Sequence, residues 1–418
     1  MALPIKYNVR NVFVRWRATV ASVSGVALIV WVYVVVQSLA VGLEKSSGNT
    51  GDPRNVMIVR KGSTAESSSI VTREQFRLML YWPEIARDAE GRPLVSADVI
   101  VLVSLPRRPP QPHASWYVQL WRRAAELSGS KEGVAKARDQ GSGEANVLVR
   151  GLSASGKELR PQVALVAGRW FAPGKREVVV SRRLAARFAN FEIGDRFLTA
   201  GQWLTVVGWM DGRASAFDSE IWMDVDQTRE IFDREYYSSV LARVSDDAAA
   251  KSLEAKVESD KRLPLRAIGE TDYYAAQTMT AVPIRILGDL LATAMSVGAV
   301  FAAMNTMYAS VGARTREIGT LRVLGFRRRT ILASFILEGA ILALAGGAVG
   351  CLVSLGWNGI STGTMSFETF SEVVFNFRVT PWLLGKGLIF SVTVGVLGSF
   401  LPALRASRLP VIAALRSV

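Results

Sequence analysis

The sequence predicts an α-helical membrane protein with four transmembrane helices and an inserted α+β extracytoplasmic domain. Half of the 418 residues are apolar and only 21% are charged, a composition too apolar for a disordered chain and unusual for a soluble protein. The apolar residues gather in four long runs, and one segment with mixed strand and helix patterns, residues 44–283, separates the first run from the other three.

The composition also excludes several kinds of site. The chain has one cysteine, Cys351, and one histidine, His113. An intramolecular disulfide and a Cys/His zinc cluster are therefore impossible. The formal charge of +14 raises nucleic acid or an anionic membrane surface as partners until the charges are located.

The first apolar run, residues 18–43, follows a basic amphipathic segment at residues 1–17. It contains no charged residue and exceeds the ~20 residues that a helix needs to cross a bilayer core. Ser38-Leu39-Ala40 resembles a signal-peptidase site, but a cleavable apolar region has only ~7–15 residues. We therefore expect an uncleaved membrane anchor rather than a signal peptide.

Residues 44–283 are predicted to form an α+β domain. Thr72-x-x-Gln75 is a capping-box pattern that predicts a helix over 72–81, and a second, amphipathic helix is expected at 246–260. β-branched and alternating stretches predict strands at 55–60, 95–105, 147–151, 162–168, 177–181, 195–199, 203–209 and 264–268.

No catalytic pattern stands out in this domain. The sequence has no G-x-S-x-G elbow, and we expect His113, beside two prolines, to lie in a loop. The domain also contains an acidic stretch of five residues: Asp211, Asp218, Glu220, Asp224 and Asp226. This stretch is either a cation site or a protein surface with ordinary charges. Its spacing matches no calcium loop, so we favour the surface. We expect this domain to bind a partner or to transmit a conformational change rather than to catalyse a reaction.

The remaining spans are predicted at residues 284–313, 330–357 and 383–404, with an extracytoplasmic loop at 358–382. Glu338 and Asn305 lie within apolar runs, and an intramembrane polar residue is a functional candidate by default. Glu338 is about eight residues into its span. We expect it to meet the neighbouring arginine-rich loop in a structural role rather than to carry protons or substrate.

Small residues recur at helical spacing within the spans. Such rows allow helices to approach closely in lipid, so we expect packing between spans, and a homodimer or a pair of permeases, through Gly298, Gly346, Gly347, Gly350 and Gly395. No span is polar enough to predict a hydrophilic channel.

The basic residues predict the orientation. Residues 1–17, 314–329 and 405–418 carry net charges of +4, +5 and +3, whereas the much longer segment 44–283 carries only +3. The positive-inside rule therefore predicts a multi-pass protein of the inner (cytoplasmic) membrane with cytoplasmic N- and C-termini and residues 44–283 outside. The net charge of +14 is then an orientation signal, and no nucleic-acid partner is expected.

The loop at residues 314–329 contains a short amphipathic pattern. Ile318, Leu321, Val323 and Leu324 form an apolar stripe that Gly325 ends. We expect this helix to dock on a partner protein. The alternatives are contact with lipid headgroups or a role in orientation alone.

This loop and the C-terminal tail resemble the FtsX/MacB-type permeases of ATP-binding-cassette systems. The matching strings are Met304-Asn-Thr-Met-Tyr-Ala-Ser-Val-Gly-Ala-Arg-Thr-Arg-Glu-Ile-Gly-Thr-Leu-Arg-Val-Leu-Gly-Phe326 and Pro402-Ala-Leu-Arg-Ala-Ser-Arg-Leu-Pro-Val-Ile-Ala-Ala-Leu-Arg416. Residues 284–418 resemble the FtsX-like permease domain, and residues 44–283 resemble the MacB-like periplasmic core domain.

The resemblance implies a dimerising, non-enzymatic subunit that works with a cytoplasmic ATPase. In that family the loop after the second span couples the permease to the ATPase. The coupling loop maps here onto Arg316, Glu317, Ile318, Gly319, Leu321, Arg322, Leu324 and Gly325. The sequence contains no G-x-x-x-x-G-K-[ST] motif. We therefore expect no catalytic residue, metal or cofactor in this chain, and ATP and Mg in the partner.

Two functions follow from the resemblance. The first is export or extraction of a lipid, lipoprotein, peptide or drug, with a possible periplasmic adaptor (membrane fusion) protein. The alternative is mechanical regulation of a periplasmic cell-wall hydrolase without transport. A sensor anchored by four helices is a third class.

Overall fold

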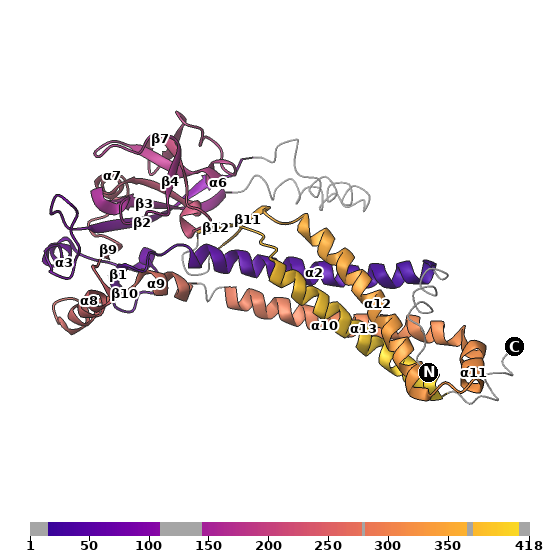
Figure 1. The fold of residues 1–418 in the computed structure, drawn as a ribbon. Helices are drawn as coiled ribbons and strands as arrows, with labels where there is room; N and C mark the ends of the chain where they lie inside the picture. Colours follow the sequence, from indigo (N-terminus) through magenta and orange to yellow (C-terminus); the bar gives the residue numbers. More distant parts are fainter. Residues whose placement is uncertain (1–15, 109–143, 278–280, 366–370, 409–418) are drawn as a thin grey trace. The chain divides into compact units, whose positions relative to one another are not determined.

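A computed structural model describes residues 16–108, 144–277, 281–365 and 371–408. His113, and the parts of the predicted cytoplasmic segments at 1–15 and 409–418, lie outside the described residues. The chain divides into two compact units (Figure 1). We call residues 1–42, 281–360 and 376–418 the helical unit, and residues 43–280 and 361–375 the α/β domain.

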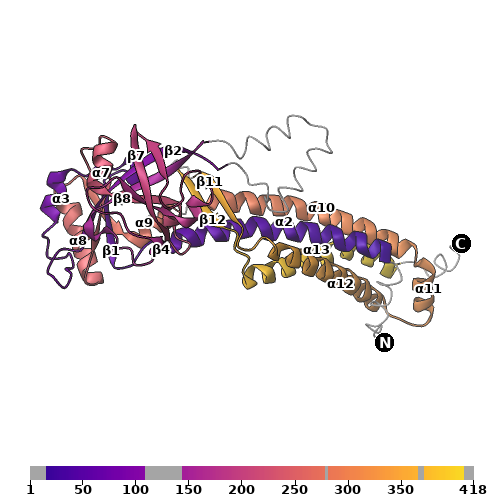
Figure 2. The same ribbon diagram turned by 90° about the horizontal axis from the view of Figure 1, so that it is seen from above.

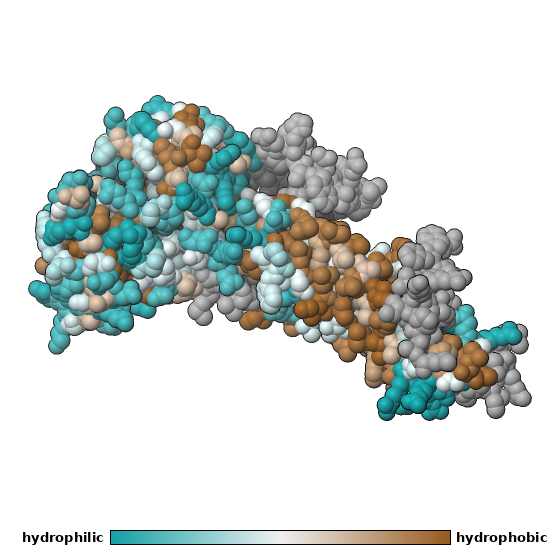
Figure 3. Space-filling model, in the orientation of Figure 1, coloured by the Kyte–Doolittle hydropathy of each residue, from teal (hydrophilic) through white to brown (hydrophobic). Residues whose placement is uncertain are grey.

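Within its described residues, the helical unit contains four helices that are long and apolar enough to cross a membrane, which confirms the predicted four-span class. They are α2 (Trp16–Gly48), α10 (Ala281–Gly312), α12 (Arg328–Leu355) and α13 (Pro381–Arg408). The four helices run alongside one another (Figure 2). Their surface is dominated by apolar side chains (Figure 3), and α11 (Thr315–Val323) connects α10 to α12.

Four of the five predicted packing glycines lie at close contacts between helices. A Cβ atom at Gly346 would come within 2.7 Å of Val26, and one at Gly350 within 2.6 Å of the Ala27 carbonyl, both on α2. Gly347 of α12 faces Ser391 of α13, and Gly395 of α13 faces Ala343 of α12. These glycines let backbones approach, as expected for spans in lipid.

Gly298 differs from the other four glycines. No atom lies within 4 Å of the position its Cβ would take. Gly298 therefore lies at no close contact between the described spans, and its predicted part in the pairing of two permeases stays a prediction. The spacing of small residues in the sequence does not show which face of α10 contacts another helix.

The α/β domain is built on a ten-stranded mixed sheet among the described residues. The order is β10-β1-β9-β2-β3-β8-β5-β7-β4, with β6 paired to β7. The β3–β8 and β5–β7 pairs are parallel and the other pairs antiparallel. The strands are β1 (Asn55–Arg60), β2 (Val95–Pro106), β3 (Glu144–Leu152), β4 (Ala164–Gly168), β5 (Glu177–Ser181), β6 (Arg196–Thr199), β7 (Gln202–Asp211), β8 (Glu220–Asp224), β9 (Ser239–Arg243) and β10 (Leu265–Gly269).

Helices pack along the sheet. They are α3 (Arg73–Met79), α6 (Arg182–Ala185), α7 (Val225–Ile231), α8 (Asp247–Ser259) and α9 (Glu270–Gln277). α8 and α9 lie next to β10, α7 next to β2 and β3, and α6 next to β5 and β7. α3 begins at Thr72, whose side chain accepts from the Gln75 amide while the Gln75 side chain accepts from the Thr72 amide. The predicted capping box is thus present, and β1 and β5 have the predicted bounds.

The acidic stretch was misjudged as a surface. Asp218, Glu220 and Asp224 are buried, because this stretch contains β8, a fully buried strand at the centre of the sheet. No group of residues able to hold a metal ion occurs in the described ranges. The interior position of β8 depends on partners far away in sequence, which a local reading of five polar residues does not reveal.

The segment between α12 and α13 belongs to the α/β domain. It forms a hairpin of β11 (Ser361–Met365) and β12 (Glu372–Asn376), where the sequence predicted only a loop. Val374 lies in the domain core, and its amide donates to Ser219 Oγ at 2.7 Å. Glu372 pairs with Arg107 at 2.7 Å and also with Arg187. The domain is therefore continuous in the chain with all four spans.

Candidate functional site

The first candidate site is the end of the helical unit at which α11 lies (Figures 1 and 2). α11 is anchored there by Ile318, which is only 2% exposed. Ile318 packs in a cluster with side chains from α10, α12 and α13: Met307, Val311, Ile331, Phe335, Ala403 and Ala406. A displacement of α11 would thus act on three spans at once, because close-packed side chains transmit strain.

The other side of α11 is exposed. Val323 and Leu324 are 61% and 67% exposed, so the predicted apolar stripe divides between an anchoring residue and two accessible ones. Gly325 ends the helix with a φ of +92°, a backbone conformation that favours glycine.

The remaining predicted coupling residues take both kinds of position. Arg316 and Glu317 are exposed, Gly319 is buried, and Leu321 and Arg322 are half-buried. Arg322 Nη1 lies 3.5 Å from the Phe326 carbonyl oxygen. Six of the eight predicted coupling residues therefore lie on α11 and the other two, Leu324 and Gly325, follow directly at its end.

A buried ion pair stands at the beginning of α11. Arg314, the residue that precedes the helix, donates from Nη1 to Glu338 Oε2 of α12 at 2.9 Å. Both side chains are less than 10% exposed. Glu338 thus meets an arginine of the loop, whereas Asn305 is exposed on α10 and is not part of this contact. A pair of this kind ties the start of α11 to the third span.

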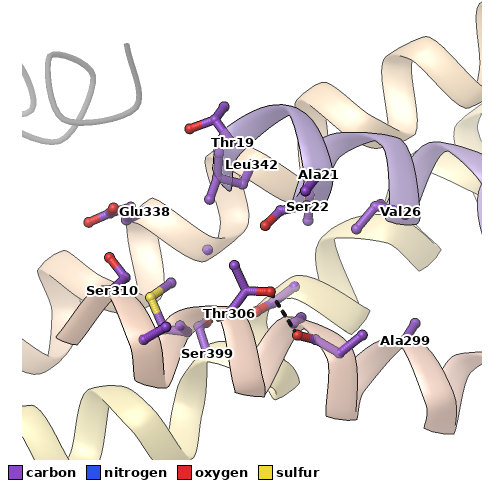
Figure 4. A pocket seen from close by; sticks show the side chains of 18 of the residues that line it. Thr19, Ala21, Ser22, Val26, Ala299, Thr306, Ser310, Glu338, Leu342 and Ser399 are labelled. Carbon is purple, nitrogen blue, oxygen red and sulfur yellow. Dashed lines mark hydrogen bonds between the residues drawn. The ribbon is translucent and has the colours of Figure 1, made fainter. Parts of the chain in front are cut away.

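The ion pair borders a cavity of about 540 Å³. All four spans contribute to its lining, and Figure 4 shows Thr19, Ser22 and Val26 of α2 across from Thr306 and Ser310 of α10. Sequence reasoning missed this cavity and the identity of Arg314 as the partner of Glu338. Their sequence separation of 24 residues leaves no local pattern that would indicate the pair.

A second polar centre lies inside the α/β domain, around Arg150 of β3. Arg150 is 1% exposed. It donates to Glu66 at 2.9 and 3.0 Å and to Glu220 at 2.8 Å through two nitrogens. Burial opposes the charge of Glu66, but Arg150 outweighs it and lowers the pKa of the Glu66 carboxyl. The guanidinium is thus saturated by two bidentate acidic partners.

A second buried guanidinium extends this centre. Arg160, 0% exposed, pairs with Asp98, which also lies 3.4 Å from Arg150. The rings of Phe217 and Trp222 lie within 6.0 Å of the Arg160 guanidinium, a cation–π arrangement. We call Arg150, Arg160, Glu66, Asp98 and Glu220 the domain ion cluster.

Glu270, the first residue of α9, lies beside this cluster. Its Oε2 accepts from the Asp52 amide at 2.9 Å and from Asn55 Nδ2 at 2.8 Å, whereas Oε1 has no partner within the described residues. Burial raises the pKa of Glu270 to about 7, although the Arg160 charge opposes the shift. Glu270 joins the segment that follows α2 to the helix that precedes α10.

Comparison with known proteins decides the family. Residues 19–260 match the model of the MacB-like periplasmic core domain, and residues 290–411 match that of the FtsX-like permease C-terminal domain. The chain belongs to the FtsX/MacB family of permeases. The expected family is therefore confirmed on both the α/β domain and the spans.

Individual relatives agree with this family. The chain is 28% identical over 265 residues to the uncharacterized ABC transporter permease YknZ of Bacillus subtilis, covering 59% of this chain and 63% of that protein. It is 30% identical over 239 residues to the macrolide export ATP-binding/permease protein MacB of Brucella abortus, covering 52% and 34%. The chain thus spans less than two thirds of the length of these relatives.

Among solved structures, the chain is similar to the periplasmic region of MacB from Actinobacillus actinomycetemcomitans. The TM-score is 0.35 at 12% identity, over 53% of this chain and 91% of the other. The extracellular domain of the noncanonic ABC-type transporter YknZ from Gram-positive bacteria gives a TM-score of 0.33 at 12% identity, over 51% and 99%.

Proposed function

We propose that this chain is the non-enzymatic membrane subunit of an ATP-binding-cassette complex, with a separate cytoplasmic ATPase docked on α11. The observation that carries the proposal is the division of α11 into two faces. Ile318 is buried among three spans, while Val323 and Leu324 are exposed at the end of the same helix. A partner that buries the exposed pair gains apolar contact. Movement of that partner would then displace α11 and, through Ile318, the three spans that pack against it.

The family relatives support an ATP-driven role, because the Brucella protein is named as both ATP-binding and permease. The charge distribution supports a cytoplasmic position for α11, since its loop carries a net charge of +5. On this proposal the inner membrane holds the protein, both termini are cytoplasmic, the α/β domain lies outside, and ATP with Mg binds the partner.

Motion would reach the α/β domain through the chain itself. Each of the four spans continues into that domain, directly or through the β11–β12 hairpin. The charged side chains Glu338 and Arg314 neutralise each other, so they do not form a hydrophilic path through the spans. This favours a function that works by conformational change of the spans. We propose export or extraction of a lipid, lipoprotein, peptide or drug, by a dimer of permeases with a periplasmic adaptor.

Regulation of a cell-wall hydrolase is the second candidate. The same continuity between spans and domain favours it, because a moving outer domain could act on an enzyme without moving cargo. The two functions differ in the partner of the α/β domain: an adaptor or lipid for transport, a hydrolase for regulation.

The ATPase proposal is tested by co-expressing the full chain with the ABC ATPases of its own organism and purifying it in mild detergent. We expect a P-loop ATPase to co-purify, and Leu324→Asp to reduce its amount about tenfold by placing a charge in the buried contact. Thr320→Ser, a conservative change at an exposed position of α11, serves as the matched control. Failure of every ATPase to bind, or unchanged binding by Leu324→Asp, contradicts the proposal.

A further inference from the structure

The side chains of the four spans leave a cavity between the helices. Several glycines of the spans, such as Gly346 and Gly395, are closely covered by a neighbouring helix, whereas Gly25, which lines the cavity on α2, has no atom within 4 Å of the position of a Cβ. An unfilled space of about 540 Å³ forfeits dispersion contacts along its walls. A molecule of matching chemistry would recover them.

The lining is that of a hydrocarbon site. Fourteen of the 21 lining residues are Ala, Gly, Val, Ile, Leu or Met. Two of the hydroxyl side chains are already satisfied within their own helices, because Thr306 donates to the Ala302 carbonyl and Ser399 to the Gly395 carbonyl. These groups therefore place little demand for polar partners on an occupant.

One end of the cavity is charged. Arg314 and Glu338 both line it and neutralise each other. Beyond them, the loop at 314–329 adds exposed arginines against the single acidic residue Glu317: Arg316, Arg327, Arg328 and Arg329. Basic pockets between spans on the cytoplasmic side bind anionic lipid headgroups.

We propose that this cavity binds one acyl chain of an anionic phospholipid of the cytoplasmic leaflet, whose phosphate lies among the arginines of residues 314–329. The inference rests on the cytoplasmic orientation proposed above but not on the ATPase. The bound chain fills the space between α2 and α10. Because Arg314 precedes α11 directly, lipid binding and the position of α11 are then linked.

The test uses the full chain without any ATPase, so that its failure is distinct from failure of the docking proposal. The protein is reconstituted in nanodiscs of equal parts phosphatidylglycerol and phosphatidylcholine, extracted, washed in detergent, and examined by native mass spectrometry. We expect phosphatidylglycerol to be retained preferentially. Equal retention of phosphatidylcholine overturns the anionic headgroup, and retention of neither lipid overturns the site.

Two variants locate the retained lipid. Ala302→Trp places a bulky ring at the cavity wall, and we expect it to reduce retention about tenfold. Phe301→Trp is the matched control, since Phe301 neighbours it but is 59% exposed and lies outside the lining. Gly25→Leu fills the cavity from α2 and serves if Ala302→Trp does not fold. Equal retention by the filled variants and the control contradicts the proposal.

Photo-crosslinking identifies the occupant independently. Phosphatidylglycerol with a diazirine on its acyl chain should label peptides containing residues 19–29 and 299–313. Label confined to exposed positions such as Leu290 overturns the site. Crosslinks between two copies of the chain through these residues show that a second copy fills the cavity, which also overturns it.

Discussion

The domain ion cluster and the Arg314–Glu338 pair, two buried charge centres within the described residues, differ in how many contacts hold each charge. In the α/β domain, two guanidinium groups share three acidic side chains, and aromatic rings cover them. In the helical unit, one arginine meets one glutamate beside a cavity. The first centre over-determines each position, whereas the second depends on a single contact. The difference indicates that several contacts hold each charge of the domain ion cluster, whereas the charges in the helical unit are held by one ion pair that a single substitution breaks.

Loss of Arg150 should have the largest effect. Arg150→Met leaves Glu66 and Glu220 buried without their main partner, and breaking such a pair costs about 3–5 kcal/mol. We expect this loss in the thermal unfolding of the full chain in detergent, together with increased proteolysis of the α/β domain.

Arg169→Met is the control for this prediction. Arg169 also holds a bidentate pair, with Glu177, but its side chain is 55% exposed. Exposed pairs contribute about 0–1 kcal/mol. Comparable destabilisation by both variants would show that the domain ion cluster is not special.

The next effect is a pH dependence in the α/β domain. Because the folded pKa of Glu270 is raised from 4.5 to about 7, the protonated form is stabilised by folding. Its contribution is complete below pH 4.5 and disappears as the pH rises through 7. The loss is on the order of 2 kcal/mol, at 1.36 kcal/mol per pKa unit with allowance for relaxation.

Glu270→Gln, which mimics the protonated form, isolates this effect. Carboxyl groups with lowered pKa values, such as Glu66, give the opposite dependence below pH 4.5 and remain in the variant. Unfolding temperatures measured from pH 5 to 8 should therefore fall in the wild type and stay level in the variant. A parallel fall in both would exclude Glu270 as the cause.

Breaking the Arg314–Glu338 pair should lower stability less than the substitutions in the α/β domain do, but should impair function more. Glu338→Gln keeps the shape and removes the charge opposite Arg314, and polar contacts between spans are worth about 0.6–1.7 kcal/mol. We expect a small fall in unfolding temperature and, if the proposed ATPase docks on α11, loss of any stimulation of that ATPase by the chain. Arg314→Gln combined with Glu338→Gln should lose less than the two single effects added together; strict additivity would mean that the two residues act separately.

The smallest effects separate packed glycines from open ones. Gly395→Ala places a methyl group against Ala343 and the Gly339 backbone, and we expect a loss of about 1 kcal/mol from overpacking. Gly298→Ala meets open space and should be neutral or stabilise slightly through helix propensity. Unfolding of both variants in the same detergent measures the difference; a larger loss at Gly298 would reveal a contact supplied by another chain.

The sequence allowed some of these features to be predicted. Long apolar runs with few or no charged residues identified the four spans, because the membrane imposes both length and composition. Thr72 and Gln75 identified a helix start from local bonding alone. Local patterns failed where the stabilising contact was distant: the burial of Glu220 depends on Arg150, 70 residues away, and Glu338 pairs with Arg314 at the far end of the loop, 24 residues away. The β11–β12 hairpin escaped notice because its partner surface is another domain segment.

That hairpin has a practical consequence for work on the α/β domain. A recombinant fragment ending near residue 283 would lack Val374 and Glu372. It would therefore uncover part of the hydrophobic core and leave Arg107 and Arg187 without their shared carboxylate. A soluble version should instead carry the hairpin sequence through a designed linker or as an added peptide. The affinity for that peptide would measure how strongly residues 361–375 contribute to the α/β domain.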